Sequence, residues 1–360
     1  MERKRIIMTV TNNLEADQRV HRVASYFHEN GWEVLVVGSR QKECHDYRQP
    51  YETLRLPVFF KRGPLFYAEF NIRLFFYLLG RKAERIWAND TDTLLAGYWA
   101  SRLTHTRLTV DLHELFPEVP EVADRRFVKL CWTKLEDWIL PHVKECYTVC
   151  QSIADYYHHR YGILVKVLRN VPFKRDYEGK TGKFDFQGKR VILYQGAVNE
   201  GRGIEWIMDA MPYVDNAVFV VIGKGDLYDE LRAKCERDGL NDRVKFLGHL
   251  PFSELSAYTN DSDLGVCLLK EKGLSYYYAL PNRVFDFMQA HVPLLATDFP
   301  EISRVLNEAH TGRVISDYEP HRLADVINEM LGTPVDHEVF TKAAEHYNWE
   351  SERTVVDLSV

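Results

Sequence analysis

The chain is poor in several features that would assign a protein class directly. Its 360 residues include only 6 Cys, and no Cys-x-x-Cys pair occurs, which argues against a disulfide framework and a zinc module. The longest apolar and aromatic run in the middle of the first half, Leu74 to Leu79, is far short of the ~20 residues of a membrane-spanning helix. Basic residues are not in excess, because 46 Lys and Arg are set against 52 Asp and Glu. We therefore expect no nucleic-acid partner and no metal site.

Two further absences bear on location and architecture. No repeat of fixed period is present, so a solenoid is not expected. The basic start leads directly into a strand-like segment, Ile6 to Val10, without the apolar core of a signal peptide. With six cysteines that are best explained as reduced thiols, this predicts a cytoplasmic protein.

Aromatic residues are abundant, with 7 Trp, 20 Tyr and 19 Phe. Such a content excludes a disordered or low-complexity chain, and the length predicts two domains that can each bury a core.

Strand and helix signals alternate along both halves, which predicts parallel sheets covered by helices. In the first half, the apolar segment Arg5 to Val10 precedes a helical face with 3.6-residue spacing, and Glu33 to Gly38 is the next strand. A second series begins at Arg190. We expect two Rossmann-like, doubly wound α/β domains in residues 1–172 and 190–335. Residues 173–189, rich in Lys, Gly and Asp, are the expected linker, and 336–360 the expected helical segment packing back toward the first domain.

Four segments that follow strands, or open a helix, are candidates for ligand chemistry. Residues 195–203 combine three glycines with Arg202 before an amphipathic helix, which suits a phosphate. Residues 223–226 form a second, shorter glycine loop between a strand and a helix. In the segment 281–288, Arg283 and Asp286 share one helical face, so the arginine suits phosphates and the carboxylate suits ribose hydroxyls. In the first half, Asp111, His113 and Glu114 end a strand, where packing alone explains three ionisable groups poorly.

Each segment also has a purely structural interpretation. The glycine loops are then tight turns with a solvated arginine, and Arg283 with Asp286 is a surface ion pair of little energetic value. His113 alone would be a structural histidine.

Together these segments resemble the retaining glycosyltransferases of the GT-B fold, family 4. The resemblance rests on "LYQGAVNEGRGIEWIMDAM", "VFVVIGKGDLYDELRA", "VKFLGHLPFSELSAYTNDSDLGVCLL" and "LPNRVFDFMQAHVPLLATDFPEI", in that order, and on "EADQRVHRVASYFHENGWEVLVVG" and "DLHE" in the first half. It extends over nearly all of the chain. It implies two domains across a cleft and transfer of a sugar from a nucleoside-diphosphate donor to an acceptor hydroxyl with retention.

The resemblance also assigns roles to residues of this sequence. It implies Asp111, His113 and Glu114 as catalytic residues of the first domain. It places the donor on the second domain, where the implied binding residues are Gly196, Glu200, Arg202, Gly203, Gly223, Gly225, Gly248, His249, Asn282, Arg283 and Asp286. No metal or other cofactor is expected, because helix dipoles and basic side chains stabilise the leaving diphosphate in this class.

Two positions depart from the family pattern. The family often has two glutamates separated by seven residues in the donor helix, and here the positions are Tyr278 and Asp286. A frequent arginine after the first glycine is Ala197, for which Arg283 is the candidate replacement. These departures leave the contacts to the sugar open.

The densest aromatic stretch bears on the acceptor. Six of the fifteen residues from Leu65 to Leu79 are aromatic, and basic residues flank them at 61–62 and 81–85. This pattern suits a helix at the inner face of a membrane that presents the site to a lipid-linked acceptor. A core-packing helix with a solvated basic end would give the same pattern. The acceptor is therefore expected to be a glycan or a lipid-linked molecule, in polysaccharide or glycolipid synthesis.

Two other functions use the same nucleotide site. A GT-B-fold sugar-nucleotide epimerase would need acid and base groups at the sugar, which the cluster at 111–114 does not exclude. A non-catalytic sugar-nucleotide-binding subunit would be favoured by Ala197 and Tyr278.

Overall fold

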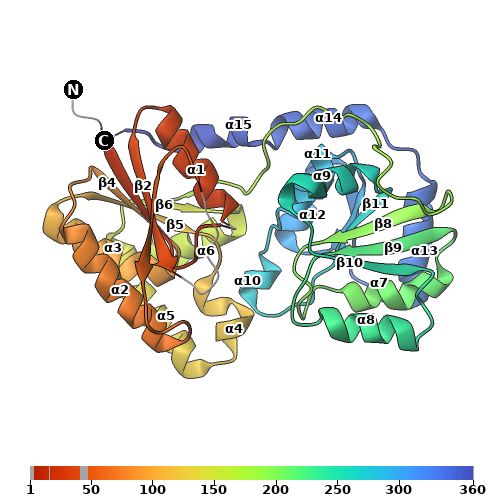
Figure 1. The fold of residues 1–360 in the computed structure, drawn as a ribbon, viewed down its shortest axis with the longest axis horizontal. Helices are drawn as coiled ribbons and strands as arrows, with labels where there is room; N and C mark the ends of the chain where they lie inside the picture. Colours follow the sequence, from red (N-terminus) through yellow and green to blue (C-terminus); the bar gives the residue numbers. More distant parts are fainter. Residues whose placement is uncertain (1–3, 16, 41–47, 360) are drawn as a thin grey trace. The chain divides into compact units, whose positions relative to one another are not determined.

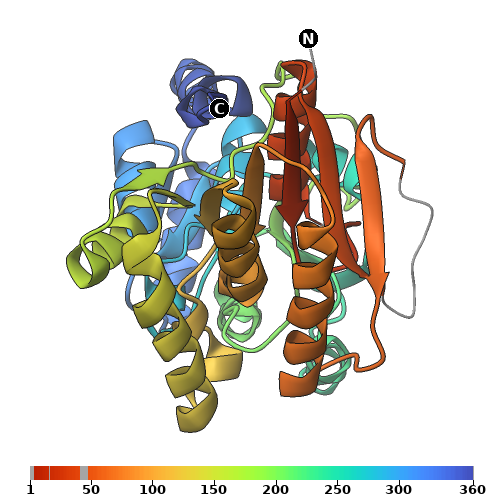
Figure 2. The same cartoon turned by 90° about the vertical axis from the view of Figure 1, so that its left-hand side faces the viewer.

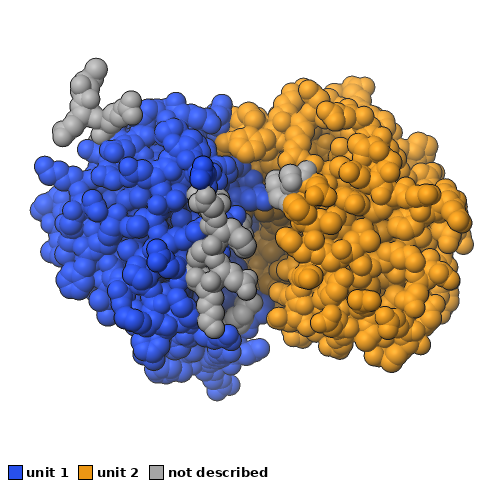
Figure 3. Space-filling view, in the orientation of Figure 1, with its two compact units in different colours: residues 1–169, 353–360 blue, residues 170–352 orange. Residues whose placement is uncertain are grey.

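The structure is a computed structural model that describes residues 4–15, 17–40 and 48–359. The chain forms two compact units, which Figure 3 colours separately: unit 1 comprises residues 1–169 and 353–360, and unit 2 residues 170–352. Each unit is an α/β layer structure around one parallel sheet, as the sequence predicts. The expected linker, 173–189, is counted with unit 2. The expected C-terminal segment is divided, because only 353–360 is counted with unit 1.

Unit 1 contains a seven-stranded parallel sheet with the strand order β3-β2-β1-β4-β5-β6-β7. Its strands are β1 (Arg5–Thr9), β2 (Glu33–Arg40), β3 (Glu52–Pro57), β4 (Arg85–Asn89), β5 (Arg107–Leu112), β6 (Glu145–Thr148) and β7 (Val165–Val167). The central strands are buried on both faces, which explains their continuous apolar sequences. The order reverses between β1 and β4, so ligands are expected at the carboxyl ends of these two strands.

The helices of unit 1 form because apolar faces recur at helical spacing. They are α1 (Gln18–Glu29), α2 (Pro64–Leu79), α3 (Thr91–Thr104), α4 (Pro120–Ala123), α5 (Arg126–Ile139) and α6 (Gln151–Tyr161). In α1 the side chain of Asp17 caps the start by accepting a hydrogen bond from the backbone N–H of Val20. Helices α2, α3 and α5 cover one face of the sheet, with α3 packed between the other two (Figure 2).

Unit 2 contains a six-stranded parallel sheet with the strand order β10-β9-β8-β11-β12-β13. Its strands are β8 (Arg190–Gln195), β9 (Ala217–Ile222), β10 (Val244–Gly248), β11 (Leu264–Cys267), β12 (Leu294–Thr297) and β13 (Gly312–Ile315). Its helices are α7 (Ile204–Ala210), α8 (Tyr228–Arg237), α9 (Phe252–Asp261), α10 (Leu274–Tyr277), α11 (Arg283–Gln289), α12 (Pro300–Ala309), α13 (Pro320–Gly332), α14 (His337–His346) and α15 (Trp349–Glu352). Helices α7, α8 and α13 cover one face, and α9, α11, α12 and α14 the other (Figure 1). The order reverses between β8 and β11.

The end of the chain completes unit 1. Arg85 on β4 has no solvent-exposed surface, and its two terminal nitrogens donate hydrogen bonds of 2.6 Å to the carbonyl oxygens of Asp357 and Ser359. Arg107 on β5 forms a 2.7 Å ion pair with the carboxylate of Asp357. Two strand arginines therefore hold the residues that follow α15.

Candidate active site

Three glycine loops lie side by side at the carboxyl edge of the unit 2 sheet. The backbone N–H of Gly196 donates to the carbonyl of Ile222 at 3.0 Å, and that of Gly223 donates to the carbonyl of Gly248 at 2.8 Å. A Cβ on Gly223, whose φ is +147°, would lie 1.8 Å from the carbonyl oxygen of Gly196. Only glycine permits this approach of backbone to backbone, so the predicted glycines build one continuous platform.

Two other predicted glycines serve close packing. Gly203 begins α7 with φ of +64°, and a Cβ there would lie 2.6 Å from the Cβ of Leu268. A Cβ on Gly225 would lie 2.1 Å from the amide oxygen of Asn199, which accepts a hydrogen bond from the backbone N–H of Asp226. Asn199 therefore ties the first two loops together, a role that the sequence did not reveal.

Arg283 points into this platform from α11. Its side chain is buried, and its guanidinium carbon lies 4.6 Å from the ring centre of Tyr194. Nη2 lies 3.2 Å from the position that a Cβ on Gly196 would take. Among the described residues, nothing hydrogen bonds to the buried Nη1 atom. The guanidinium group thus lies beside Gly196, the residue that precedes Ala197.

Arg202 provides a second cation at the start of α7. Its guanidinium carbon lies 5.0 Å from the ring centre of Tyr276 on α10. Its Nε is buried and finds no hydrogen-bond acceptor in the part of the chain that the structure describes. Because a buried donor without a partner is unfavourable, the two arginines define a site that is suited to an anion.

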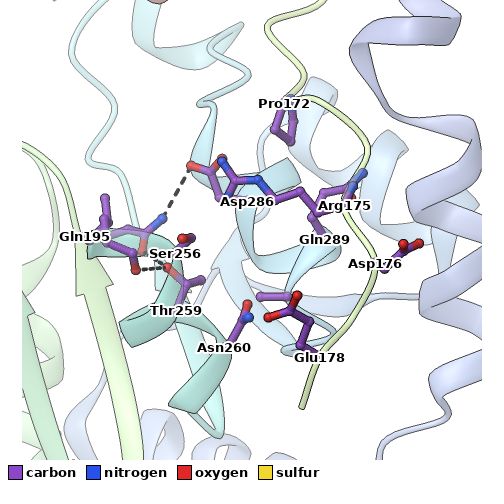
Figure 4. Close-up of a pocket in the computed structure, with 12 residues that line it drawn as sticks. Pro172, Arg175, Asp176, Glu178, Gln195, Ser256, Thr259, Asn260, Asp286 and Gln289 are labelled. Atoms are coloured by element: carbon purple, nitrogen blue, oxygen red, sulfur yellow. Dashed lines mark hydrogen bonds between the residues drawn. The ribbon is translucent and has the colours of Figure 1, made fainter. Parts of the chain in front are cut away.

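Asp286 lies one helical turn beyond Arg283 and borders a polar cavity of about 380 Å³ in unit 2. Figure 4 shows the carboxylate and the amide of Gln195 pointing toward each other, with Nε2 donating to Oδ2 at 3.4 Å. Gln195 also accepts a 2.7 Å hydrogen bond from the hydroxyl of Thr259. The residues that line the cavity are Pro172, Arg175, Asp176, Glu178, Gln195, Leu255, Ser256, Thr259, Asn260, Asp286, Gln289 and Ala290. Four of them belong to residues 170–178, a segment from which the sequence predicted no site residue.

The remaining predicted residues of unit 2 lie at the surface. Glu200 pairs with Lys272 at 2.5 Å, and this pairing lowers the pKa of its carboxyl group. His249 and Asn282 are exposed, and Asn282 immediately precedes α11. Tyr278 follows α10 directly, so a phenol stands where the family often has a carboxylate.

In unit 1, Asp111 lies in a buried ion pair. Its side chain is fully buried, and its two oxygens accept hydrogen bonds from Nε and Nη2 of Arg19 at 2.9 and 2.6 Å. Burial opposes ionisation, but the charge of Arg19 outweighs it and holds the pKa of Asp111 well below its usual range. Both carboxylate oxygens of Asp111 are therefore engaged by the guanidinium group of Arg19.

His113 connects this pair with the loop after β4. Its Nδ1 lies 3.2 Å from Oδ2 of Asp90, and its Nε2 lies 3.2 Å from Oδ1 of Asn89 and 3.6 Å from Oδ2 of Asp111. Burial disfavours the protonated ring, but the carboxylates of Asp90 and Asp111 outweigh burial and raise the pKa of His113 to about 9. The imidazole is therefore a cation at neutral pH. Glu114 is exposed.

Two further carboxyl groups and a hydroxyl complete the cluster of unit 1. Burial raises the pKa values of Asp90 and Asp92 to about 7. The hydroxyl of Thr11, after β1, donates to Oδ2 of Asp92 at 2.5 Å, which bridges the point where the strand order reverses. Asp90 has a φ of +59° and accepts the backbone N–H of His113 at 2.8 Å. These residues follow β1 and β4, the two strands between which the order reverses, where ligands are expected in such sheets.

For the aromatic helix α2, the sequence left open whether it packs on the core or presents apolar side chains at the surface, and the structure shows both. Phe66, Phe70, Leu74 and Leu78 face the core, whereas Ile72 and Phe76 are 59% and 66% exposed. One face therefore packs on the sheet, and the opposite face presents apolar side chains.

No helix in the ranges 4–15, 17–40 and 48–359 combines the length and apolar character needed to cross a membrane. In the same ranges, no three His, Cys, Asp or Glu side chains are grouped as metal ligands.

Two parallel α/β sheets, one with a basic glycine platform, are the architecture of the GT-B glycosyltransferases. Comparison with family models agrees: residues 16–170 match Glycosyltransferase Family 4, and residues 189–333 match Glycosyl transferases group 1. Together the two models match most of the chain, which therefore belongs to the GT-B glycosyltransferases that they describe.

Similar curated proteins are also glycosyltransferases. A phosphatidyl-myo-inositol mannosyltransferase of Mycobacterium leprae is 25% identical over 169 residues, which is 44% of this chain and 43% of that protein. An alpha-D-kanosaminyltransferase of Streptomyces kanamyceticus is 22% identical over 42% of this chain and 39% of its own length. The alignments thus span less than half of these relatives.

Solved structures share the whole fold at low identity. Sucrose-phosphate synthase from Thermosynechococcus elongatus has a TM-score of 0.81 at 16% identity, covering 98% of this chain and 97% of that one. HepE from Anabaena in complex with UDP-glucose has a TM-score of 0.72 at 15% identity, covering 97% of both chains.

Proposed function

We propose that this chain transfers a glycosyl group from a nucleoside-diphosphate sugar to an acceptor hydroxyl, with retention of the anomeric configuration. The observation that carries the proposal is the pair of guanidinium groups, Arg202 and Arg283, each with a buried donor that lacks a partner within the described residues. Family membership and the complexes of HepE with UDP and UDP-glucose support the same substrate class.

In this proposal, the diphosphate binds over Gly196 and Gly223 between the two arginines. As the bond from the sugar to the diphosphate breaks, negative charge grows on the leaving oxygen, and the guanidinium groups stabilise it. Asp286 accepts hydrogen bonds from ribose hydroxyls, and the polar cavity beside it accommodates the nucleoside. The loop at Gly248 and His249 contacts the base. Because the two arginines neutralise the negative charge of the leaving diphosphate, we propose that transfer needs no metal ion and persists in EDTA.

Unit 1 acts on the acceptor side. The imidazolium of His113 and the carboxyl groups of Asp90 and Asp92 offer donors and acceptors to hydroxyl groups. Asn89 contacts the imidazole at Nε2, and Asp111, paired with Arg19, has a positioning role through its charge. We propose that the reaction takes place in the cytoplasm, in the synthesis of a cell-surface polysaccharide or glycolipid. The relative from Mycobacterium leprae is named a phosphatidyl-myo-inositol mannosyltransferase, and a phosphatidyl group is a phospholipid group, which supports a glycolipid product.

The decisive experiment measures nucleotide binding by calorimetry with Arg283→Met. Loss of a charge-assisted hydrogen bond costs about 1.5–3 kcal/mol, so the affinity for UDP or GDP should fall roughly ten- to hundredfold, while that for uridine or guanosine stays the same. Arg313→Met is the matched control, because Arg313 pairs with Glu329 at the surface of unit 2. An unchanged affinity for all diphosphates in Arg283→Met would refute the donor site.

Turnover then separates the alternatives. With the preferred sugar nucleotide and an acceptor, release of free nucleoside diphosphate and an NMR coupling constant that matches the donor's anomer support retaining transfer. An isomerised sugar nucleotide would instead identify an epimerase.

A further inference from the structure

An apolar pocket of about 440 Å³ opens on unit 1, between α2, α3 and α5. These helices lie side by side on one face of the sheet (Figure 2). The residues that line the pocket are Tyr67, Ala68, Asn71, Ile72, Phe75, Phe76, Leu95, Ala96, Trp99, Trp132 and Leu135. Its volume falls in the range of about 300–1,000 Å³ of small-molecule sites. None of these residues belongs to the donor site.

The pocket offers its ligand almost no hydrogen bonds. Asn71 is the one amide among the lining residues, and both of its polar atoms are engaged. Its Nδ2 donates to the carbonyl oxygens of Tyr67 and Asp92 at 2.9 and 2.7 Å, and its Oδ1 accepts the backbone N–H of Ala96 at 3.1 Å. A polar ligand would lose its hydration here without compensation, so the chemistry of the walls selects a hydrocarbon.

The surface around the pocket is apolar and basic. Exposed apolar residues surround it on all three helices, including Ile72 and Phe76 on α2, Trp99 and Leu103 on α3, and Leu130 and Trp138 on α5. Arg73, Lys129 and Lys134 on these helices are paired with Glu69, Glu118 and Asp137. The exposed basic residues toward the helix ends and in their flanks include Arg62, Arg81, Lys82, Arg102, Arg125 and Arg126. The acidic residues of the three helices are also engaged. Glu69 accepts the backbone N–H groups of Phe59 and Phe60, and Asp92 accepts the hydroxyl of Thr11. On α5, Glu136 accepts the hydroxyl of Thr91, and Asp137 pairs with Arg160. In a chain with a net charge of −6, this face complements an anionic head group.

The pocket is also connected with the cluster of unit 1. Asn71 binds the carbonyl of Asp92, whose carboxyl group belongs to that cluster. On the other side, Trp132 packs edge-on against Phe116, 4.9 Å between ring centres, in the loop that carries His113. A hydrocarbon chain in the pocket would therefore contact Asn71 and Trp132, and these two residues in turn contact Asp92 of the cluster and Phe116 of the loop that carries His113.

We propose that this pocket binds the hydrocarbon chain of a lipid-linked, anionic acceptor. The inference rests on the proposed glycosyl transfer and specifies its acceptor class. The chain is buried among the aromatic and aliphatic walls, and the basic residues bind the phosphate of the head group. The aromatic stretch of α2 then serves substrate recognition as well as the core.

The test uses butyl, hexyl, octyl and decyl phosphate as monomers, with the fluorescence of Trp99 and Trp132 as the signal, in the full chain. Each buried methylene contributes about 0.8 kcal/mol, so the affinity should rise about fourfold per methylene until the pocket is full. An affinity that does not depend on chain length would overturn the proposal.

Two variants distinguish a pocket from a merely sticky surface. Ala68 is exposed at the pocket, so Ala68→Trp fills the space without disturbing the core and should weaken decyl phosphate binding at least tenfold. Phe127→Ser removes an apolar side chain that is 77% exposed on α5 and lies outside the pocket, and it should leave binding unchanged. Non-specific adsorption predicts the reverse, with tighter binding to Ala68→Trp and weaker binding to Phe127→Ser, and that result would refute the pocket.

Measurements of UDP and GDP binding on the same samples keep the two proposals separate. If the nucleotides bind and alkyl phosphates do not, the acceptor inference is wrong and the donor site stands. If alkyl phosphates bind and nucleoside diphosphates do not, glycosyl transfer is refuted. Binding to phosphatidylglycerol vesicles without binding of monomeric alkyl phosphates would show a bilayer contact instead of a chain pocket.

Discussion

The ion pair of Arg19 and Asp111 makes the sharpest prediction about unit 1. Both side chains are at least 95% buried, and two hydrogen bonds join them at 2.6 and 2.9 Å. Replacement of Asp111 with Asn keeps the shape but leaves the guanidinium of Arg19 buried without a counter-ion. Removing one partner of a buried pair costs about 3–5 kcal/mol, so the free energy of unfolding of unit 1 should fall by that amount.

The pH dependence provides an independent check. The pKa of Asp111 is depressed in the folded state, so its contribution is present above the unfolded value of about 3.9 and is lost as the pH falls toward the folded pKa. The difference between wild type and Asp111→Asn should therefore be full at pH 7 and shrink below about pH 4.

Urea unfolding followed by tryptophan fluorescence measures the effect, since Trp87 is fully buried on β4. Lys134→Met is the control, because Lys134 is exposed on α5 and its 3.4 Å pair with Asp137 is worth at most about 1 kcal/mol. If Asp111→Asn abolished turnover while unfolding stayed within about 1 kcal/mol of wild type, Asp111 would act in the chemistry and our assignment of a positioning role would be wrong.

Three further predictions follow from the same structure. Gly223→Ala should abolish nucleotide binding because its Cβ would collide with Gly196, whereas Gly239→Ala, also at positive φ but with open space, should retain binding and cost about 1–2 kcal/mol of stability in calorimetric unfolding. NMR titration should find the imidazole of His113 protonated up to about pH 9. The protonated ring therefore stabilises the folded state fully below about pH 6.5, and this stabilisation is lost as the pH rises through 9. Asp90→Asn should lower the pKa of His113, and an unchanged pKa would exclude the contact between His113 and Asp90. Deletion of residues 357–360 should lower the free energy of unfolding of unit 1 by roughly 1.5–3 kcal/mol for each lost hydrogen bond to Arg85, and with it the thermal midpoint. An unaltered midpoint would show that Arg85 finds other partners.

The sequence was sufficient to predict the fold because each central strand is a continuous apolar run. β1 and β2 were predicted within two residues of their bounds and β8 at its first residue, since burial on both faces leaves a strong pattern. The edge strands β3 and β13 were missed because they are mostly half-exposed and mix polar with apolar residues. The family resemblance and the α/β class were confirmed.

Residues of the candidate site could be predicted from the sequence only where the spacing of neighbouring residues indicates their role. Glycines in loops after strands and a helix start near Arg202 can be recognised locally, but the approach of Arg283 to Gly196 joins residues 87 positions apart. Likewise, nothing local to residues 111–114 shows that Arg19 neutralises Asp111 or that Asp90 and Thr11 belong to the same cluster. Contacts between distant strand ends depend on the strand order, which the periodicity of a single segment does not contain.

The return of the chain end to unit 1 has a consequence for synthesis. Arg85 emerges from the ribosome early, but the carbonyl oxygens that it binds belong to residues 357 and 359. Until those residues leave the exit tunnel, the nascent unit 1 holds a guanidinium group without two of its native acceptors, although all of its strands have already been made. Unit 2, residues 170–352, is continuous in sequence and is synthesised before the segment 353–360 that joins unit 1. Unit 1 can therefore form these two hydrogen bonds only after the whole of unit 2 has been synthesised.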